Sequence, residues 1–319
     1  MIRIAVDAMG GDNAPEEIIK GAALAKDQYQ IILVGPDFLR KRLPQGVTLV
    51  EAPEWIEMDE HPAAALRRKR NSSLMVAANL VREGKADAFV SAGNSGAAMG
   101  AALLKLGRIP GVARPAIAIP LPTINREPCL ILDAGANVDC TEENLLQFAQ
   151  MGANYYQAVF KIEEPRVGLV SIGEEETKGD KLTLATHKLL AQSELNFIGN
   201  IEGKDLTTGT AHVAVCDGFV GNIILKFAEG MASSIFKILK EEVKKSWLRQ
   251  LGMGLAKPAL KSLASRFDYA EYGGAPLLGV DGVVMISHGR SNARAILSSI
   301  NSAAACVEKQ VVQKLKEVK

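Results

Sequence analysis

Six short apolar runs each end in a polar residue close to glycine, and turns of this composition are suited to binding anions. Ile2–Val6 leads into Asp7-Ala8-Met9-Gly10-Gly11, and Ala86–Val90 leads into Ser91-Ala92-Gly93-Asn94-Ser95-Gly96. Glycine lets backbone N–H groups approach a ligand, and the N-terminus of a following helix adds partial positive charge. The other four turns begin at Asp133, Ser171, Asp217 and Ser287.

If these runs are parallel strands of one sheet, their carboxyl ends share one edge, where α/β proteins bind ligands. Gly93–Gly96, opening a helix predicted for Gly96–Leu106, is suited to hold phosphate, and Arg290–Asn292 is a second such turn. Neither matches GxGxxG or GxxxxGK[ST], which weakens a dinucleotide or P-loop assignment. The convergence of six polar turns predicts an active site at this edge.

The histidines and serines point to neither a metal enzyme nor a serine hydrolase. The four histidines show no metal-binding spacing, so no metal is expected, and Ser91 and Ser171 lack the GxSxG elbow. His288 alone stands at a strand end among glycines and is a candidate for chemistry. The four cysteines are widely spaced, and three of them stand in apolar surroundings typical of reduced core residues of a cytosolic protein.

Strands and helices alternate along the chain, which predicts a mostly parallel sheet in a three-layer α/β/α sandwich. The chain has eight apolar runs in this order. Besides Ile2–Val6 and Ala86–Val90 they are Gln30–Val34, Ala116–Ile119, Cys129–Leu132, Val167–Val170, Val213–Val215 and Val283–Ile286. Helical patterns lie between many of them: Glu16–Lys26, Ser73–Glu83, Gly96–Leu106, Glu142–Phe160 and Lys181–Gln192. We expect a single domain over 1–319.

A helical hairpin is predicted as an insertion at about 235–268. Apolar residues from Ile235 to Leu251 recur every four positions, and Gly252, Gly254 and Pro258 are expected to end that helix. Lys244–Arg266 holds six basic and no acidic residues. One reading is a dimerisation hairpin, and the other is a tip that contacts an anionic membrane surface. The candidate contacts are Trp247, Leu251, Met253, Leu255 and Lys257.

The overall charge and hydropathy exclude other classes. A formal net charge of +1 provides no field for binding nucleic acid. Met1–Asp7 is expected to form a strand and not a signal peptide. The longest uncharged run, Ala88–Leu104, is interrupted by polar residues and glycines, so no bilayer span is expected.

The chain resembles the phosphate acyltransferase family called PlsX over nearly its whole length. The matching stretches are DAMGGDNAP from Asp7, RRKRNSS from Arg67, VSAGNSG from Val90, LDAGANVD from Leu132, IGEEETKG from Ile172, GNIEG from Gly199, DGFVGNIILK from Asp217 and YGGAPLLGVDGVVMISHG from Tyr272. Two positions depart from the family pattern. Asn13 stands where histidine is usual, and Ser95 stands where threonine is usual but keeps the hydroxyl.

The resemblance implies a Rossmann-like sandwich related to isocitrate and isopropylmalate dehydrogenases and to phosphotransacetylases. It implies a homodimer that transfers a fatty-acyl group from acyl carrier protein to inorganic phosphate, without a cofactor. The acyl phosphate would feed a membrane glycerol-3-phosphate acyltransferase in phosphatidic acid synthesis. The expected location is the cytoplasm, peripherally at the inner face of the cell membrane.

For that reaction we assign a phosphate cradle and four catalytic candidates. The cradle comprises Gly10, Gly11, Ser91, Gly93, Asn94, Ser95 and Gly96. Lys178 would neutralise negative charge, Asn222 would donate to the oxyanion, and His288 could protonate the leaving thiolate. Asp217 would orient Lys178 or Asn222. Each has a purely structural alternative. Lys178 could be a solvated loop lysine, Asn222 a helix cap and Asp217 a turn former.

Two competing hypotheses remain. A dehydrogenase of the isocitrate kind would need a nicotinamide and a divalent metal, and neither fingerprint is present. A membrane-surface scaffold built around the hairpin would leave the six polar turns without a role.

Overall fold

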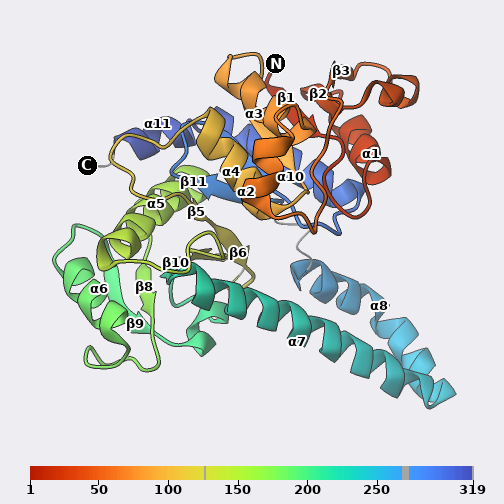
Figure 1. Cartoon of the computed structure of the whole chain (residues 1–319). Helices are drawn as coiled ribbons and strands as arrows, with labels where there is room; N and C mark the ends of the chain where they lie inside the picture. Colours follow the sequence, from red (N-terminus) through yellow and green to blue (C-terminus); the bar gives the residue numbers. More distant parts are fainter. Residues whose placement is uncertain (126, 268–272, 318–319) are drawn as a thin grey trace.

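The computed structural model describes residues 1–125, 127–267 and 273–317. Its strands form two sheets (Figure 1). The first has the order β3(Thr48–Glu51), β2(Gln30–Gly35), β1(Arg3–Asp7), β4(Ala88–Ser91), β12(Val283–Ile286), β11(Ala275–Leu278), β5(Ala116–Ile117). The second has the order β6(Ile119–Leu121), β7(Cys129–Leu132), β10(Val213–Val215), β8(Val167–Val170), β9(Phe197–Ile201).

The mostly parallel α/β class is confirmed, but the expectation of one sheet is wrong. Antiparallel pairing occurs at β11, with β12 and β5, and between β6 and β7. The apolar run Ala116–Ile119, expected to form one strand, belongs to two strands in the structure. It divides at the buried Ala118, so that β5 joins the first sheet and β6 the second. Strand–turn–helix units look alike in sequence whichever sheet they enter, which is why the pattern did not separate them.

Helices cover both faces of the first sheet. Alternate residues of its central strands point to opposite sides, because side chains alternate across a strand. Ile4 and Val6 pack in one core with α1(Glu16–Ala25) and α10(Ala293–Glu308), whereas Ala5 packs in the other. That second core includes α2(Pro62–Arg68), α3(Ser73–Arg82) and α4(Ser95–Lys105). Strands buried on both faces explain the continuous apolar runs.

The second sheet is flanked by α5(Glu142–Phe160), which packs on β7 and β10, and by α6(Lys181–Ala191). Thr141 and Asn144 form a capping box that fixes where α5 begins. The chain ends in α11(Val311–Lys316), which packs against α5. Two short 3-10 helices, η1(Asp37–Arg42) and η2(Gly203–Thr207), lie in the connections after β2 and β9.

The hairpin consists of α7(Gly218–Lys244) and α8(Trp247–Phe267), which extend away from the sheets (Figure 1). Two details of the prediction were wrong. The first helix begins at Gly218, immediately after β10, and the turn lies at Lys245 and Ser246. Gly252, Gly254 and Pro258 lie inside α8. Their unfavourable helix propensities, about 1 kcal/mol for glycine and about 3 kcal/mol for proline, do not end that helix.

Among the described residues, α7 is the one helix long and apolar enough to cross a bilayer by length and composition alone. Its Gly218 and Gly221 are buried against the second sheet. Much of its remaining apolar surface is exposed.

Candidate active site

The polar turns after β1, β4 and β12 lie side by side at one edge of the first sheet. Val6 and Met285 both pair with Val90, so the three strands end in register. Ser287 N–H donates to the Ser91 carbonyl at 2.8 Å, and Asp12 N–H donates to the Gly289 carbonyl at 2.8 Å. Three segments distant in sequence are thus tied together at this edge.

A buried carboxylate organises the turns. Asp7 is 2% exposed and accepts hydrogen bonds from the Ser91 hydroxyl at 2.8 Å and from Met9 N–H at 3.2 Å. The Ser91 oxygen in turn accepts Gly93 N–H at 3.0 Å. Burial raises the pKa of Asp7, and the hydrogen bonds it accepts from Ser73, Ser91 and the backbone oppose that shift. Asp7 therefore couples β1 to β4.

Position 10 must be glycine because the backbone of the turn after β4 lies too close to leave room for a side chain. A Cβ atom at this position would lie 2.6 Å from an Asp7 carboxylate oxygen and 2.7 Å from Gly93 N. Gly11 packs on Ala92 in the same way and has a φ of +105°. The turns after β1 and β4 are thus in direct contact, which brings the predicted cradle residues together.

Asn94 is the N-cap of α4, and its side chain is occupied by the protein. Its Oδ1 accepts Ala97 N–H at 3.0 Å, while its Nδ2 donates to the Met58 carbonyl at 3.1 Å and to the Glu60 carbonyl at 3.0 Å. Asn94 therefore contributes to the cradle through its backbone and by fixing the N-terminus of α4. Ser95 is exposed at the first helical position.

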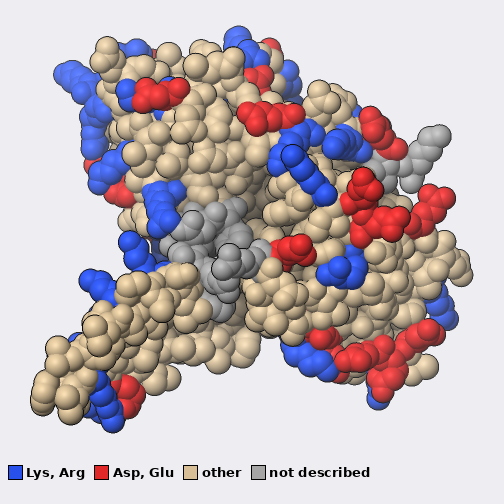
Figure 2. Space-filling view, turned by 180° about the vertical axis from the view of Figure 1, so that it is seen from behind, with Lys and Arg blue, Asp and Glu red and all other residues tan. Residues whose placement is uncertain are grey.

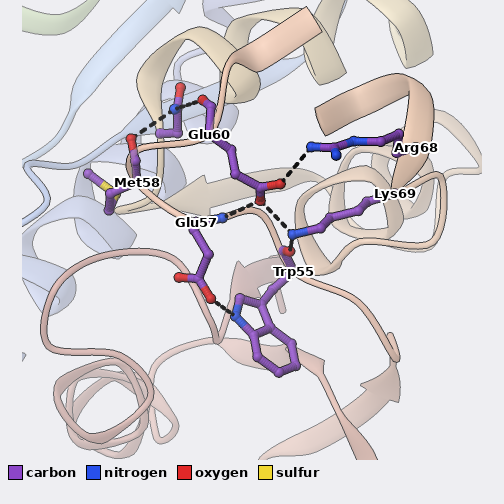
Figure 3. A network of polar contacts seen from close by, with 7 residues as sticks. Trp55, Glu57, Met58, Glu60, Arg68 and Lys69 are labelled. Carbon is purple, nitrogen blue, oxygen red and sulfur yellow. Dashed lines mark hydrogen bonds and ion pairs between the residues drawn. The ribbon is translucent and has the colours of Figure 1, made fainter. Parts of the chain in front are cut away.

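The segment held by Asn94 is stabilised by a polar network around Glu60 (Figure 3). The Glu60 carboxylate accepts from Lys69 Nζ at 2.5 Å, from Glu57 N–H at 2.9 Å and from Arg68 Nη2 at 3.2 Å. Lys69 also donates to the Trp55 carbonyl at 2.8 Å. The Lys69 ammonium lowers the pKa of Glu60. This network connects α2 to the N-terminus of α4.

His288 and Arg290 lie in the third turn of this edge. His288 is half-buried, and its Nδ1 accepts Arg290 N–H at 3.1 Å. Asn13 Nδ2 donates to the carbonyls of Arg290 at 3.2 Å and Ser291 at 3.4 Å. The Asn13 amide thus holds the turn that carries His288.

A second edge is formed by β7, β10 and β8, where Leu132 and Leu169 both pair with Val215. Asp133 is fully buried and accepts backbone N–H groups from Ile117 at 3.0 Å, Ala136 at 3.1 Å and Asn137 at 2.6 Å. Burial raises its pKa. Asp133 thus repeats at the second sheet the organising role of Asp7 at the first.

Asp217 and Asn222 lie at the start of α7 on this second edge. Asp217 is the N-cap and accepts Val220 N–H at 2.8 Å. A Cβ atom at Gly221 would lie 1.9 Å from the Asp133 carbonyl oxygen, so only glycine fits there. Asn222, one residue on, is exposed and lies beside Gly135. Asp217 is thus a helix cap, the role that the structural alternative gave to Asn222, whereas Asn222 lies inside α7.

Lys178 lies in the turn after β8 and is exposed. Its carbonyl accepts the Ser171 hydroxyl at 3.1 Å, and its N–H donates to the Glu175 carbonyl at 3.0 Å. Asn200 Nδ2 also donates to the Glu175 carbonyl at 2.9 Å. The loop backbone is held while the ammonium remains available to solvent.

The predicted residues therefore fall into two groups instead of sharing one edge. The cradle residues and His288 belong to the first sheet, whereas Lys178, Asp217 and Asn222 belong to the second. The expectation of a single edge was wrong because it assumed a single sheet. Each group is nevertheless contiguous, since its three strands are neighbours.

Sequence reasoning missed Asp7, Asp133 and Glu60 as organising groups. For the two aspartates a signal was present, because each is the first polar residue after an apolar run and precedes glycine. Nothing in the sequence pairs Glu60 with Lys69 nine positions later. Within the described residues, no group of three or more His, Cys, Asp or Glu side chains is placed to hold a metal ion.

Comparison with solved structures defines the class of fold. The chain superposes on a phosphotransacetylase from Streptococcus pyogenes with a TM-score of 0.63 at 18% identity, covering 98% of this chain and 94% of that one. A branched-chain phosphotransacylase from Enterococcus faecalis gives 0.62 at 13% identity, covering 96% and 99%. A 4-hydroxythreonine-4-phosphate dehydrogenase from Klebsiella pneumoniae gives 0.58 at 12% identity, covering 96% and 98%. The protein is an α/β protein of the phosphotransacetylase fold.

Sequence comparison gives the family. Residues 2–314 match the family described as "Fatty acid synthesis protein", and the chain belongs to it. Phosphate acyltransferase from Pelotomaculum thermopropionicum is 55% identical over 99% of this chain and 94% of its own length. Phosphate acyltransferase from Desulfitobacterium hafniense is 53% identical over 99% and 97%.

Proposed function

We propose that the protein transfers a fatty-acyl group from acyl carrier protein to inorganic phosphate, giving acyl phosphate. The observation that carries the proposal is the packing of Gly10 against Gly93, which gathers backbone groups of two turns at the N-terminus of α4. The curated relatives named phosphate acyltransferase support the same reaction. A cradle of this kind suits a small tetrahedral anion.

In the proposed reaction a phosphate oxygen attacks the thioester carbonyl carbon, a C–O bond forms, and the C–S bond breaks. Phosphate is already nucleophilic near neutral pH, so the protein mainly positions charge. Lys178 neutralises the anion, and Asn222 donates to the carbonyl oxygen as it becomes negative. His288 protonates the departing thiolate. Asp217 acts through α7, since its carboxylate caps the helix that carries Asn222.

The reaction is tested by supplying acyl-acyl carrier protein and phosphate and trapping acyl phosphate with hydroxylamine. The wild type should give hydroxamate. Asn222→Ala should lower kcat by about 100- to 1000-fold, as expected for one oxyanion donor. Lys178→Ala should also lower turnover, with Lys181→Ala, in the first turn of α6, as the matched control. Hydroxamate absent from the wild type would end the proposal, whereas full activity in Lys178→Ala would end only that assignment.

A homodimer is proposed from the exposed apolar stripe of α7. Phe219, Ile223 and Phe227 recur every four residues and are each more than half exposed, and the stripe continues through Met231 and Ile235. A second copy of the chain would bury this surface. The measurement is the mass in solution by light scattering: Phe227→Glu should shift it toward monomer, and an unchanged mass would contradict the assignment.

Peripheral contact with the inner face of the cell membrane is proposed for the far end of the hairpin. Trp247, Leu251 and Leu255 are 60–87% exposed, Met253 is half-buried, and Lys257 is exposed nearby. Figure 2 shows the hairpin largely covered by uncharged residues on the visible face, with basic groups and an acidic group beside them. Such surfaces suit an anionic bilayer. The proposed location is the cytoplasm, where acyl phosphate would pass to a membrane glycerol-3-phosphate acyltransferase.

A further inference from the structure

A groove of about 670 Å³ lies between α2 and α4, with Met75 of α3 at its side. Its lining is mainly apolar, contributed by Pro62, Ala63, Leu66, Met75, Leu103 and Leu104. Leu104 is 65% exposed, although it lies on a helix whose opposite side is buried. The groove therefore presents apolar surface that the described chain leaves open.

Two glycines of α4 form part of the groove wall. A Cβ atom at Gly96 would lie 2.8 Å from Pro62 Cγ, and one at Gly100 would lie 2.5 Å from Leu66 Cδ1. The two helices approach each other closely at these points because α4 has no side chain there. The resulting wall is smooth and apolar.

The groove begins where the phosphate cradle ends. Gly96 belongs to both, since it lines the groove and is the second residue of α4. From Gly96 to Leu104 the helix advances about 12 Å at 1.5 Å per residue. A phosphate held in the cradle would thus lie beside the start of an apolar groove.

The charged residues of the lining are all basic. Arg67 and Arg70 come from α2 and the turn after it, and Lys105 comes from the end of α4. Among the described residues, no acidic side chain lines the groove. This arrangement complements a ligand with an apolar tail and an anionic carrier.

We propose that the α2–α4 groove binds the acyl chain of the thioester substrate, with Arg67, Arg70 and Lys105 facing its acidic carrier. The inference rests on the proposed function, which places the thioester carbon beside the cradle phosphate. From that point the acyl chain must leave across the protein surface, and the groove is apolar from Gly96 onward. The groove is therefore the specificity-determining subsite for chain length.

The test compares Ala63→Trp with Ala64→Trp. Both alanines are exposed on α2, but only Ala63 lines the groove. An indole at position 63 should fill the groove and lower kcat/KM for palmitoyl-carrier at least tenfold, because each buried methylene contributes about 0.8 kcal/mol. The value for butyryl-carrier should change less than twofold, and Ala64→Trp should match the wild type with both.

A second pair of variants guards against a folding defect. Leu104→Asp places a charge in the groove, and Leu24→Asp places one at a similarly exposed site on α1. Only Leu104→Asp should weaken equilibrium binding of the fluorescent fatty acid cis-parinarate, again at least tenfold. Two results would overturn the inference. One is an equal loss of kcat/KM for palmitoyl- and butyryl-carrier in Ala63→Trp. The other is unchanged cis-parinarate binding in both Ala63→Trp and Leu104→Asp.

Other outcomes separate the inference from the proposed function. If cis-parinarate binding depends on Ala63 and Leu104 but the wild type makes no acyl phosphate, the groove assignment stands and the reaction fails. If Ala63→Trp changes the mass in solution and not chain-length preference, the groove seats a second copy and the acyl-chain assignment is overturned.

Discussion

The Ser91 hydroxyl donates a 2.8 Å hydrogen bond to the Asp7 carboxylate, 84 residues earlier in the chain, and neither group is exposed beyond 2%. The pair joins the ends of β1 and β4, and Gly93 N–H extends it toward α4. The phosphate cradle is thus positioned by Asp7, a buried acid that would not itself contact the ligand.

The turns after β1 and β4 pack so closely that adding one methyl group at Gly10 should destabilise the protein. Gly10→Ala would bring Cβ within 2.7 Å of Gly93 N and within 2.6 Å of Asp7. Overpacking of this kind costs about 1–3 kcal/mol. Urea unfolding should show that loss, and turnover should fall with it. Gly203→Ala, where nothing lies within 4 Å, is the control and should retain both. A wild-type-like Gly10→Ala would contradict the contact.

Asp7 should make stability depend on pH. Its pKa is raised in the folded protein, so between the ordinary carboxyl pKa and the raised value the folded state holds a proton that the unfolded chain has lost. Stability from this group therefore falls as pH rises through that interval. Asp7→Asn removes the dependence. Urea unfolding from about pH 4 to about pH 8 should show the variant gaining on wild type as pH increases. Asp133, shifted in the same direction, remains in both proteins and cancels in the difference.

The Glu60 network should control phosphate binding from a distance. Lys69→Met removes the ammonium that bridges Glu60 and the Trp55 carbonyl, which should loosen the segment held by Asn94. We expect KM for phosphate to rise severalfold with a smaller change in kcat. Arg68→Met is the matched control, since Arg68 bonds the same carboxylate but its side chain is 69% exposed. Equal effects of the two variants would argue against a positioning role for Lys69.

Membrane contact and catalysis should be separable. Lys257 and Lys261 are exposed on α8, distant in sequence from every cradle residue. Reversing both charges, Lys257→Glu with Lys261→Glu, should abolish binding to vesicles rich in phosphatidylglycerol, because each basic residue near such a surface contributes about 1 kcal/mol. Hydroxamate production in solution should be unchanged. Retained vesicle binding would place the contact elsewhere or remove it.

Much of the fold was readable from pattern, because apolar runs and helical periodicity report burial directly. Glu142–Phe160 was predicted from its helical pattern with both ends correct, and the structure shows that Thr141 and Asn144 fix its start locally. The division into two sheets was not readable, because it depends on Ala118, a buried residue that resembles its neighbours. The hairpin turn at Lys245 was missed because the sequence carries strong helix-breaking residues elsewhere, within α8. Gly252 and Pro258 are local breakers, and the helix accommodates both.

For the site, the sequence identified which turns carry polar groups but not what those groups do. Asn94 was assigned to the cradle without a role for its side chain, and the structure shows its amide bonded on both sides to protein. Such roles arise from three-dimensional neighbours such as Met58, 36 residues away. Composition and spacing carry no record of them.

The double use of the Asn94 amide has a consequence for redesign. Aspartate is normally an equivalent exchange at the beginning of a helix, because its oxygen caps equally well. Here Asn94→Asp would keep the cap but set a second anionic oxygen against the Met58 and Glu60 carbonyls, which now receive N–H groups. A swap that looks conservative would leave α4 intact while detaching its neighbour, so substitution tables give the wrong guidance at this position.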